Sequence, residues 1–218
     1  VPSGNFGNIL SGFVAKEMGL PIKNLVLATN ENNVLDDFFK SGVYRVRNPK
    51  ETLITSSPSM DISKASNFER FIYEISDRDS NYVSFLWNEL REKQSFTIDK
   101  NKFQKLIKES GIVSGSSNHN NRINTIRKIY ELNELVIDPH TADGIYIGDK
   151  YLEENCPMIC LETALPTKFE ETVQEALGFV PERIDCFKNI EERARRFYET
   201  DGTISDLKNY IIKNADIN

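Results

Sequence analysis

The chain has 218 residues, of which 39% are hydrophobic and 28% are charged, a composition typical of a globular protein with a hydrophobic core. Its formal net charge of −6 and the lack of a basic stripe argue against nucleic-acid binding, and no apolar run approaches the ~18 residues of a membrane helix. Three cysteines and two histidines favour neither a disulfide framework nor a metal site, so we expect reduced thiols in a cytoplasmic protein.

Short apolar runs alternate with longer segments of helical periodicity. The runs favour buried strands, and Gly or Pro residues end several of the helices. Between about residues 67 and 111 only helical periodicity is found, which favours a helical insertion. In chain order, the pattern predicts a helix over 7–19, a strand over 25–29, helices over 34–40, from 67, over 83–90 and 102–109, a turn over 115–121, a helix over 123–132, a strand over 135–137, a helix from 139, a strand over 158–161, and helices over 169–177, 190–198 and 204–213.

This alternation predicts the fold class. Strands that alternate with helices are typical of an α/β fold with an open, mostly parallel sheet and helices on both of its faces.

The motif Ser3-Gly4-Asn5-Phe6-Gly7-Asn8 leads directly into the first predicted helix. Its two glycines let the backbone bend so that successive N–H groups point the same way, and the helix N-terminus adds unpaired donors and the positive end of its dipole. Asn5 and Asn8 can add side-chain donors. The pattern indicates a phosphate site built from backbone, although a glycine turn that only opens a helix fits it equally well.

Two further motifs follow predicted strands. Asp138-Pro139-His140 combines a favoured N-cap with a favoured first helical residue, and Leu161-Glu162-Thr163 places a hydroxyl at a strand end. Ligands of open α/β sheets bind at the carboxyl ends of strands, so both motifs are candidates for a site. Packing or capping by His140, and a strand terminus closed by Thr163 and a proline turn, explain the same residues without a ligand. For Asn67, before another predicted helix, we expect an N-cap role.

Five motifs, in this order and at these spacings, resemble those of threonine synthases of the fungal and enterobacterial type. They are V-P-S-G-N-F-G-N, A-T-N-E-N, S-P-S-M-D-I with S-N-F-E-R, D-P-H-T-A-D-G and L-E-T-A-L-P-T-K-F, and they extend from Val1 to Phe169. The resemblance implies the type II fold of pyridoxal-phosphate enzymes, as in the tryptophan synthase β subunit. It also implies a lyase of threonine biosynthesis that converts O-phospho-L-homoserine and water to L-threonine and phosphate.

The resemblance also implies roles for individual residues. Five residues match the family's loop that holds the phosphate of pyridoxal 5'-phosphate: Gly4, Asn5, Phe6, Gly7 and Asn8. Thr163 matches the residue that faces the pyridine nitrogen, which would stay largely unprotonated because a hydroxyl is a weak acid. If residues 3–5 were instead the family's Ser-Gly-Asn loop for the substrate carboxylate, the first assignment would move from cofactor to substrate.

The resemblance makes this chain a C-terminal portion. The family's lysine that binds the cofactor covalently would lie upstream of Gly4, so no catalytic residue is assigned here and we expect the chain alone to be inactive without the absent N-terminal portion. Lys64, Arg70 and Arg122 are candidates for binding the substrate phosphate, but no motif anchors them.

The expected organisation has three parts. Residues 1–66 would form the cofactor-phosphate-binding part of a large α/β domain, residues 67–134 a mainly helical subdomain, and residues 135–218 the remainder of the large domain with C-terminal helices. Three alternatives stay open: another type II lyase resembling serine or threonine dehydratases, a non-catalytic homologue that binds cofactor or phosphoamino acid, and an unrelated α/β binding domain.

Overall fold

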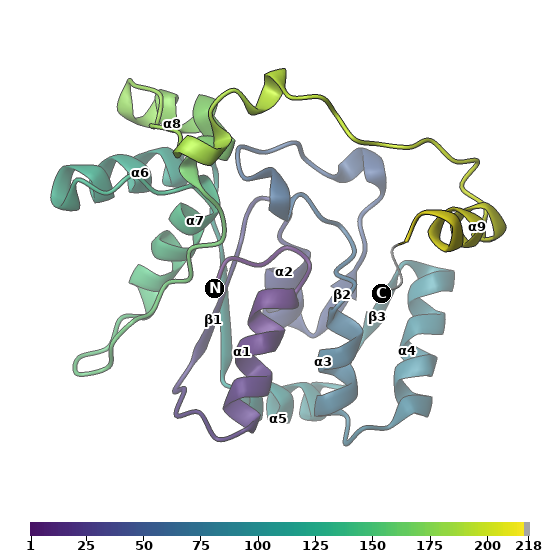
Figure 1. Cartoon of the computed structure of the whole chain (residues 1–218). Coiled ribbons are helices and arrows are strands. Elements are labelled where there is room, and N and C mark those ends of the chain that lie inside the picture. Colours follow the sequence, from purple (N-terminus) through teal and green to yellow (C-terminus); the bar gives the residue numbers. More distant parts are fainter. Residues whose placement is uncertain (216–218) are drawn as a thin grey trace. The chain divides into compact units, whose positions relative to one another are not determined.

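A computed structural model describes residues 1–215, and the chain divides into two compact units, Val1–Glu182 and Arg183–Asn218 (Figure 1). The second unit contains the helix α9 (Ile204–Asn214), which the Thr203 side chain caps by accepting the Asp206 N–H. The elements of the first unit are α1 (Gly7–Glu17), β1 (Leu25–Thr29), α2 (Val34–Ser41), β2 (Val43–Arg45), α3 (Phe68–Ile75), α4 (Ser80–Lys93), β3 (Ser95–Thr97), α5 (Lys100–Ser110), β4 (Ile112–Ser116), α6 (His119–Asn133), α7 (Pro139–Gly148) and α8 (Glu170–Leu177).

Strands β1 and β4 run parallel, from Leu25 opposite Ile112 to Thr29 opposite Ser116. Residues 1–3 lie beside β1 in the same direction: the Ala28 N–H donates to the Val1 carbonyl and the Ala28 carbonyl accepts from the Ser3 N–H, both at 3.0 Å. Three extended segments therefore end at one edge of the sheet, the edge at which α/β proteins place their ligands.

Both faces of β1 are covered by helices. Leu25 and Leu27 point into the main core with α1, α2 and α3, whereas Val26 and Ala28 pack against Ile147 of α7. In Figure 1, β1 lies between α7 and the pair α1 and α2. This alternation follows from the period of two along a strand, and the predicted α/β class with helices on both faces of a parallel sheet is confirmed.

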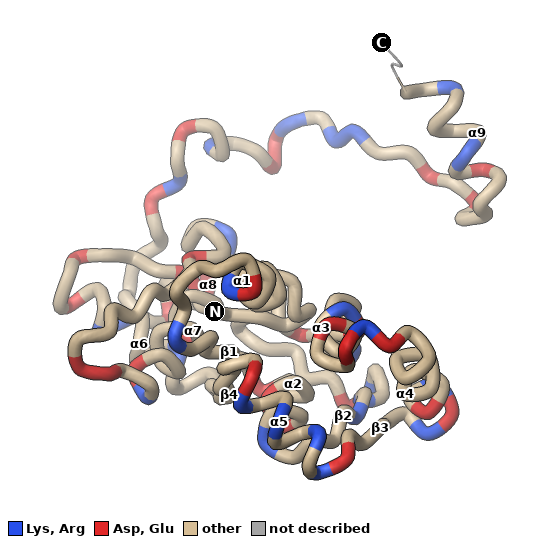
Figure 2. Tube along the Cα trace, turned by 90° about the horizontal axis from the view of Figure 1, so that it is seen from below, with Lys and Arg blue, Asp and Glu red and all other residues tan. Residues whose placement is uncertain are grey.

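Aromatic rings form the centre of the main core. The Phe68 ring lies 4.8 Å from that of Phe38 and 4.7 Å from that of Tyr44, centroid to centroid. The Tyr44 hydroxyl accepts the Ala65 N–H at 2.9 Å, and burial raises the pKa of Tyr44 to about 12. The core thus fixes the segment that leads into α3. On the outside, Lys and Arg lie among Asp and Glu on α3 and α4, whereas the charged residues of α5 are mostly Lys (Figure 2). None of the helices within residues 1–215 is long and apolar enough to cross a membrane.

Several predicted elements were wrong. Strand β4 was not predicted, because the glycine and serines of Ile112–Ser116 resemble a turn, yet its pairing with β1 buries most of it. The strands predicted over 135–137 and 158–161 are absent, and Met158 and Ile159 are exposed. A strand needs a hydrogen-bonding neighbour, and within the described residues none pairs with these segments. The helix predicted over 190–198 is only a short turn, Ile190–Glu192, without a buried face to stabilise it.

A buried charged group joins α6 to α7. The Arg122 guanidinium is fully buried and donates to Asp143 Oδ1 at 3.2 Å, to Ser56 Oγ at 2.9 Å and to the Glu31 carboxylate. Burial raises the pKa of Asp143 to about 7, although the Arg122 guanidinium acts in the opposite direction. Two carboxyl groups share one guanidinium, so a proton on Asp143 relieves the excess negative charge.

The raised pKa of Asp143 makes stability depend on pH. An acid whose pKa is higher in the folded state binds its proton more tightly there, so its contribution to stability falls as pH rises from about 4 to about 7. The Asp143→Asn variant lacks this titration. We expect the unfolding free energy of the wild type, relative to Asp143→Asn, to fall across this range by on the order of a few kcal/mol.

Denaturation midpoints measured at several pH values check this expectation. The exposed carboxylate of Asp149, which pairs with Lys128 at 3.1 Å, provides the control variant Asp149→Asn. If the unfolding free energy of the wild type relative to Asp143→Asn stayed constant or grew with pH, the result would contradict the raised pKa of Asp143.

Candidate functional site

Four segments surround a cavity of about 340 Å³ at the carboxyl edge of the sheet. They are residues 2–8 without Phe6, the Ser59–Met60 segment with Asn67, His140 at the start of α7, and Thr163, Ala164 and Lys168 ahead of α8. The candidate residues Gly4, Asn5, Gly7, Asn8 and Thr163 therefore line one cavity, although they are far apart in the sequence.

The Phe6 ring points away from the cavity. Its backbone is left-handed, with φ of 63°, and its side chain is fully buried in the aromatic core. The ring centroid lies 5.2 Å from those of both Phe68 and Phe71. A bulky residue is uncommon in this conformation, so the buried ring holds the loop in its bend. Phe6 can contribute only backbone groups to a ligand.

The first turn of α1 presents unpaired donors to the cavity. No side chain caps this helix, and its first backbone bond runs from the Leu10 N–H to the Phe6 carbonyl at 3.1 Å. The preceding N–H groups, which include those of Gly7 and Asn8, have no acceptor within the helix. Next to them Gly4 touches the opposite wall, because a Cβ at Gly4 would lie 2.7 Å from Met60 Cα. The arrangement suits an anion.

Asn5 and Asn67 fix the loop to the start of α3. The Asn67 side chain donates to the Asn5 carbonyl at 3.0 Å and accepts from Arg70 at 2.8 Å, while the Asn5 side-chain oxygen accepts the Ser66 N–H. Asn67 occupies the N-cap position predicted for it, but its side chain makes no cap hydrogen bond and contacts the loop instead.

Asp61 ties the Ser59–Met60 wall to the end of β1. Its carboxylate accepts from the Asn30 and Asn32 side chains at 2.8 Å each and from the Thr55 N–H at 2.9 Å. The A-T-N-E-N and S-P-S-M-D-I motifs thus bind each other.

His140 braces the same wall from α7. Its Nε2 accepts the Ser59 N–H at 3.1 Å, and because a backbone N–H can only donate, this nitrogen carries no proton. The proton is on Nδ1, which donates to Asp138 Oδ1 at 2.8 Å, and Asp138 also accepts the His140 backbone N–H. The ring packs 4.6 Å from that of Phe169. With both nitrogens engaged, His140 supports the cavity wall as a neutral imidazole.

The remaining wall contributes polar groups of two kinds. Thr163 lines the cavity from an exposed, irregular segment instead of the predicted strand end. Lys168, which the sequence did not single out, also lines it, whereas Lys64, Arg70 and Arg122 do not. The only signal for Lys168 was its place in the motif that contains Thr163.

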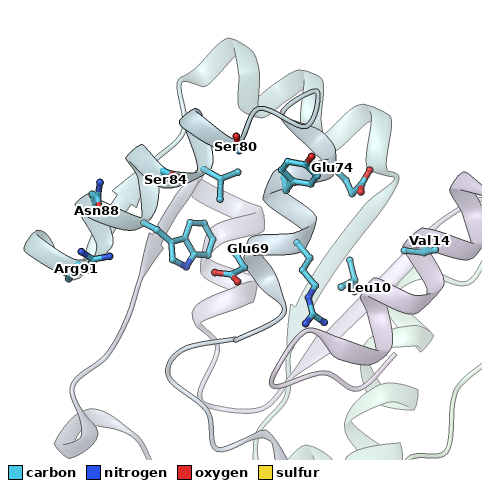
Figure 3. Close-up of a pocket in the computed structure, with 12 residues that line it drawn as sticks. Leu10, Val14, Glu69, Glu74, Ser80, Ser84, Asn88 and Arg91 are labelled. Atoms are coloured by element: carbon cyan, nitrogen blue, oxygen red, sulfur yellow. The ribbon is translucent and has the colours of Figure 1, made fainter.

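A larger groove of about 660 Å³ lies between α1, α3 and α4. Figure 3 shows Leu10 and Val14 on one side of it and Ser84 and Asn88 on the other, with Glu69 between them. It shares no lining residue with the first cavity. Because Gly4, Asn5, Gly7, Asn8 and Thr163 line only the smaller cavity, that cavity is the candidate site.

The buried ring of Phe6 gives a test of the loop's support. Phe6→Ala removes the ring from a filled core and should lower the free energy of unfolding by about 3–5 kcal/mol. The control Phe85→Ala removes a ring that is 56% exposed on α4, so its effect should stay within about 0.5 kcal/mol. Chemical denaturation measures both, and equal effects would show that Phe6 does not anchor the loop.

Comparisons with known proteins agree with the motifs. The family described as "Threonine synthase, C-terminal" matches residues 141–211. The threonine synthase of Methylobacillus glycogenes is 48% identical over 213 residues, which are 98% of this chain and 45% of that protein. That of Corynebacterium glutamicum is 44% identical over 214 residues, 97% of this chain and 44% of that protein. The chain thus spans less than half the length of these relatives.

Solved structures give the same result for the fold. A threonine synthase from Brucella melitensis, described as bound to PLP, superposes with a TM-score of 0.85 and 34% identity over 96% of this chain and 44% of that chain. The yeast enzyme gives a TM-score of 0.81 and 33% identity over 97% of this chain and 46% of that chain. In sequence and in fold, the chain is therefore homologous to the C-terminal portion of threonine synthases and has the type II fold of pyridoxal-phosphate enzymes.

Proposed function

We propose that this chain forms part of a cytoplasmic threonine synthase, which uses pyridoxal 5'-phosphate to convert O-phospho-L-homoserine and water into L-threonine and phosphate. The main support is that Thr163 and four residues of the loop line the same cavity, and that both match the family's cofactor-binding motifs; the four loop residues are Gly4, Asn5, Gly7 and Asn8. Its volume of about 340 Å³ is in the range of small-molecule sites.

The chemistry of the cavity fits this cofactor. The uncapped start of α1 provides donors and a positive dipole for a phosphate dianion, and no carboxylate is among the described residues of the lining. Ser3, which also lines the cavity, is buried, and its Oγ has no hydrogen-bond partner within the described residues. Such a group is costly to leave unpaired, so it favours a ligand that accepts or donates there.

On this proposal, the residues of the chain bind and orient the cofactor. The backbone of Gly4, Gly7 and Asn8 holds its phosphate, and the hydroxyl of Thr163 hydrogen-bonds its pyridine nitrogen. The bound cofactor supplies the electron sink on which loss of the substrate's protons and phosphate depends. Thr163 leaves the pyridine nitrogen largely unprotonated, which favours elimination over reactions that store electrons on the ring.

Turnover on this proposal needs more than residues 1–218. The chain spans 45% of its relative from Methylobacillus glycogenes, and no catalytic lysine is assigned within it. We therefore expect residues 1–218 alone to form no threonine. The full-length protein should form threonine and phosphate from O-phospho-L-homoserine and should leave serine unreacted. Deamination of serine in place of this reaction would favour the dehydratase-like alternative.

Gly7 offers a matched pair of variants that differ in charge. A Cβ at Gly7 meets only the Asn67 side chain, at 3.4 Å, so both Asp and Asn can be accommodated. In the full-length protein, Gly7→Asp places a carboxylate next to the bound dianion and should weaken cofactor binding by on the order of several kcal/mol. Gly7→Asn has nearly the same shape without the charge and should bind more tightly than Gly7→Asp. Equal affinities in a cofactor titration would place the phosphate elsewhere.

Thr163 is tested by removing its hydroxyl alone. Thr163→Val keeps the shape of the side chain and should weaken cofactor binding by about 0.5–1.5 kcal/mol. Thr167→Val removes the same group from a neighbouring residue that does not line the cavity, and should leave the affinity unchanged. The absorbance of bound cofactor measures both variants. An effect of Thr167→Val as large as that of Thr163→Val would refute the role of Thr163.

A further inference from the structure

Lys168 has the single charged side chain among the described residues that line the cavity. It belongs to the short 3-10 turn Pro166–Phe169, directly before α8. Backbone N–H groups line the cavity near α1, so the two walls offer different kinds of anion-binding group.

Contacts with aromatic rings place the Lys168 ammonium beside the cavity. Its Nζ lies 5.6 Å from the centroid of the buried Phe169 ring, and that ring packs against His140, which also lines the cavity. Within residues 1–215, no carboxylate lies within ion-pair distance of Lys168. The side chain is exposed at the rim of the cavity, so its charge is available to a ligand that enters from solvent.

The proposed reaction brings two phosphate groups into this site. The cofactor's phosphate stays bound and matches fixed backbone donors at the start of α1. The substrate's phosphate enters and leaves in each cycle, which suits a flexible ammonium that acts as a point charge. Resting on the proposed function, we propose that Lys168 binds the phosphate group of the substrate and of the released product.

The test uses the full-length holoenzyme, so that the cofactor's phosphate already fills the loop of residues 4–8. Lys168→Met should raise both the KM for O-phosphohomoserine and the inhibition constant of inorganic phosphate by about 10–100-fold, the loss expected for one hydrogen bond to a charged group. Lys168→Arg keeps the charge and should restore most of both. Cofactor affinity and the spectrum of bound cofactor should stay within about twofold of the wild type.

Lys150 provides a matched control. Its Nζ lies 4.2 Å from the centroid of the Tyr146 ring, and the residue is exposed but does not line the cavity. Lys150→Met therefore removes the same charge and the same kind of ring contact, and its kinetic constants should match those of the wild type.

Several outcomes would overturn the role of Lys168. An unchanged inhibition constant for phosphate in Lys168→Met would do so even if KM rises, because the lysine would then bind the substrate carboxylate. A parallel loss of cofactor affinity would assign Lys168 to the cofactor. Failure of Lys168→Arg to restore phosphate inhibition would also refute it. Calorimetric titration of each holoenzyme with inorganic phosphate measures phosphate binding by Lys168 without turnover. A wild-type protein that makes no threonine would refute the proposed function, but it would not by itself refute phosphate binding by Lys168.

Discussion

The hydrogen bonds of the Asp61 carboxylate determine where one wall of the cavity stands. Two asparagines that follow β1, Asn30 and Asn32, donate to it, and Asn30 is fully buried. Asp61 directly follows Met60, whose backbone covers Gly4 so closely that no Cβ fits between them. The position of the glycine loop relative to this wall therefore depends on a carboxylate that need not touch a ligand.

His140 holds the same wall from the opposite side. Asp138 caps α7 and orients the imidazole, which in turn accepts the Ser59 N–H. Supports from β1 and from α7 thus converge on residues 57–61, a segment that contains only one short 3-10 turn, Pro58–Met60. A loop held from two sides by partly buried hydrogen bonds keeps its geometry without regular secondary structure.

The sequence predicted the elements whose signals are local. The strand over 25–29 was predicted with its observed bounds, and α1 and α7 were recognised from periodicity and capping residues. Elements that depend on distant partners were not predicted well. Strand β4 exists because β1 lies beside it, whereas residues 158–161 have the composition of a strand but no paired neighbour in the described part of the chain.

The candidate site shows the same division. Motif order was enough to group the loop of residues 4–8 with Thr163, but the hydrogen bonds of Asn67 and His140 depend on contacts across the fold. Lys168 was missed because an isolated lysine before a helix is typical of a solvated surface. The cofactor roles of the loop and of Thr163, and the domain boundaries at residues 66 and 134, remain predictions.

Phe6 has a consequence for how an anion enters the site. Because its buried ring sets the bend of the loop, the donors are aligned before any ligand arrives. An entering phosphate then orders few backbone torsions, so little conformational entropy is lost on binding. Association needs no loop closure, and its rate is governed by diffusion and by the orientation of the incoming group. Differences in affinity among related ligands should then reside mainly in how fast each one leaves.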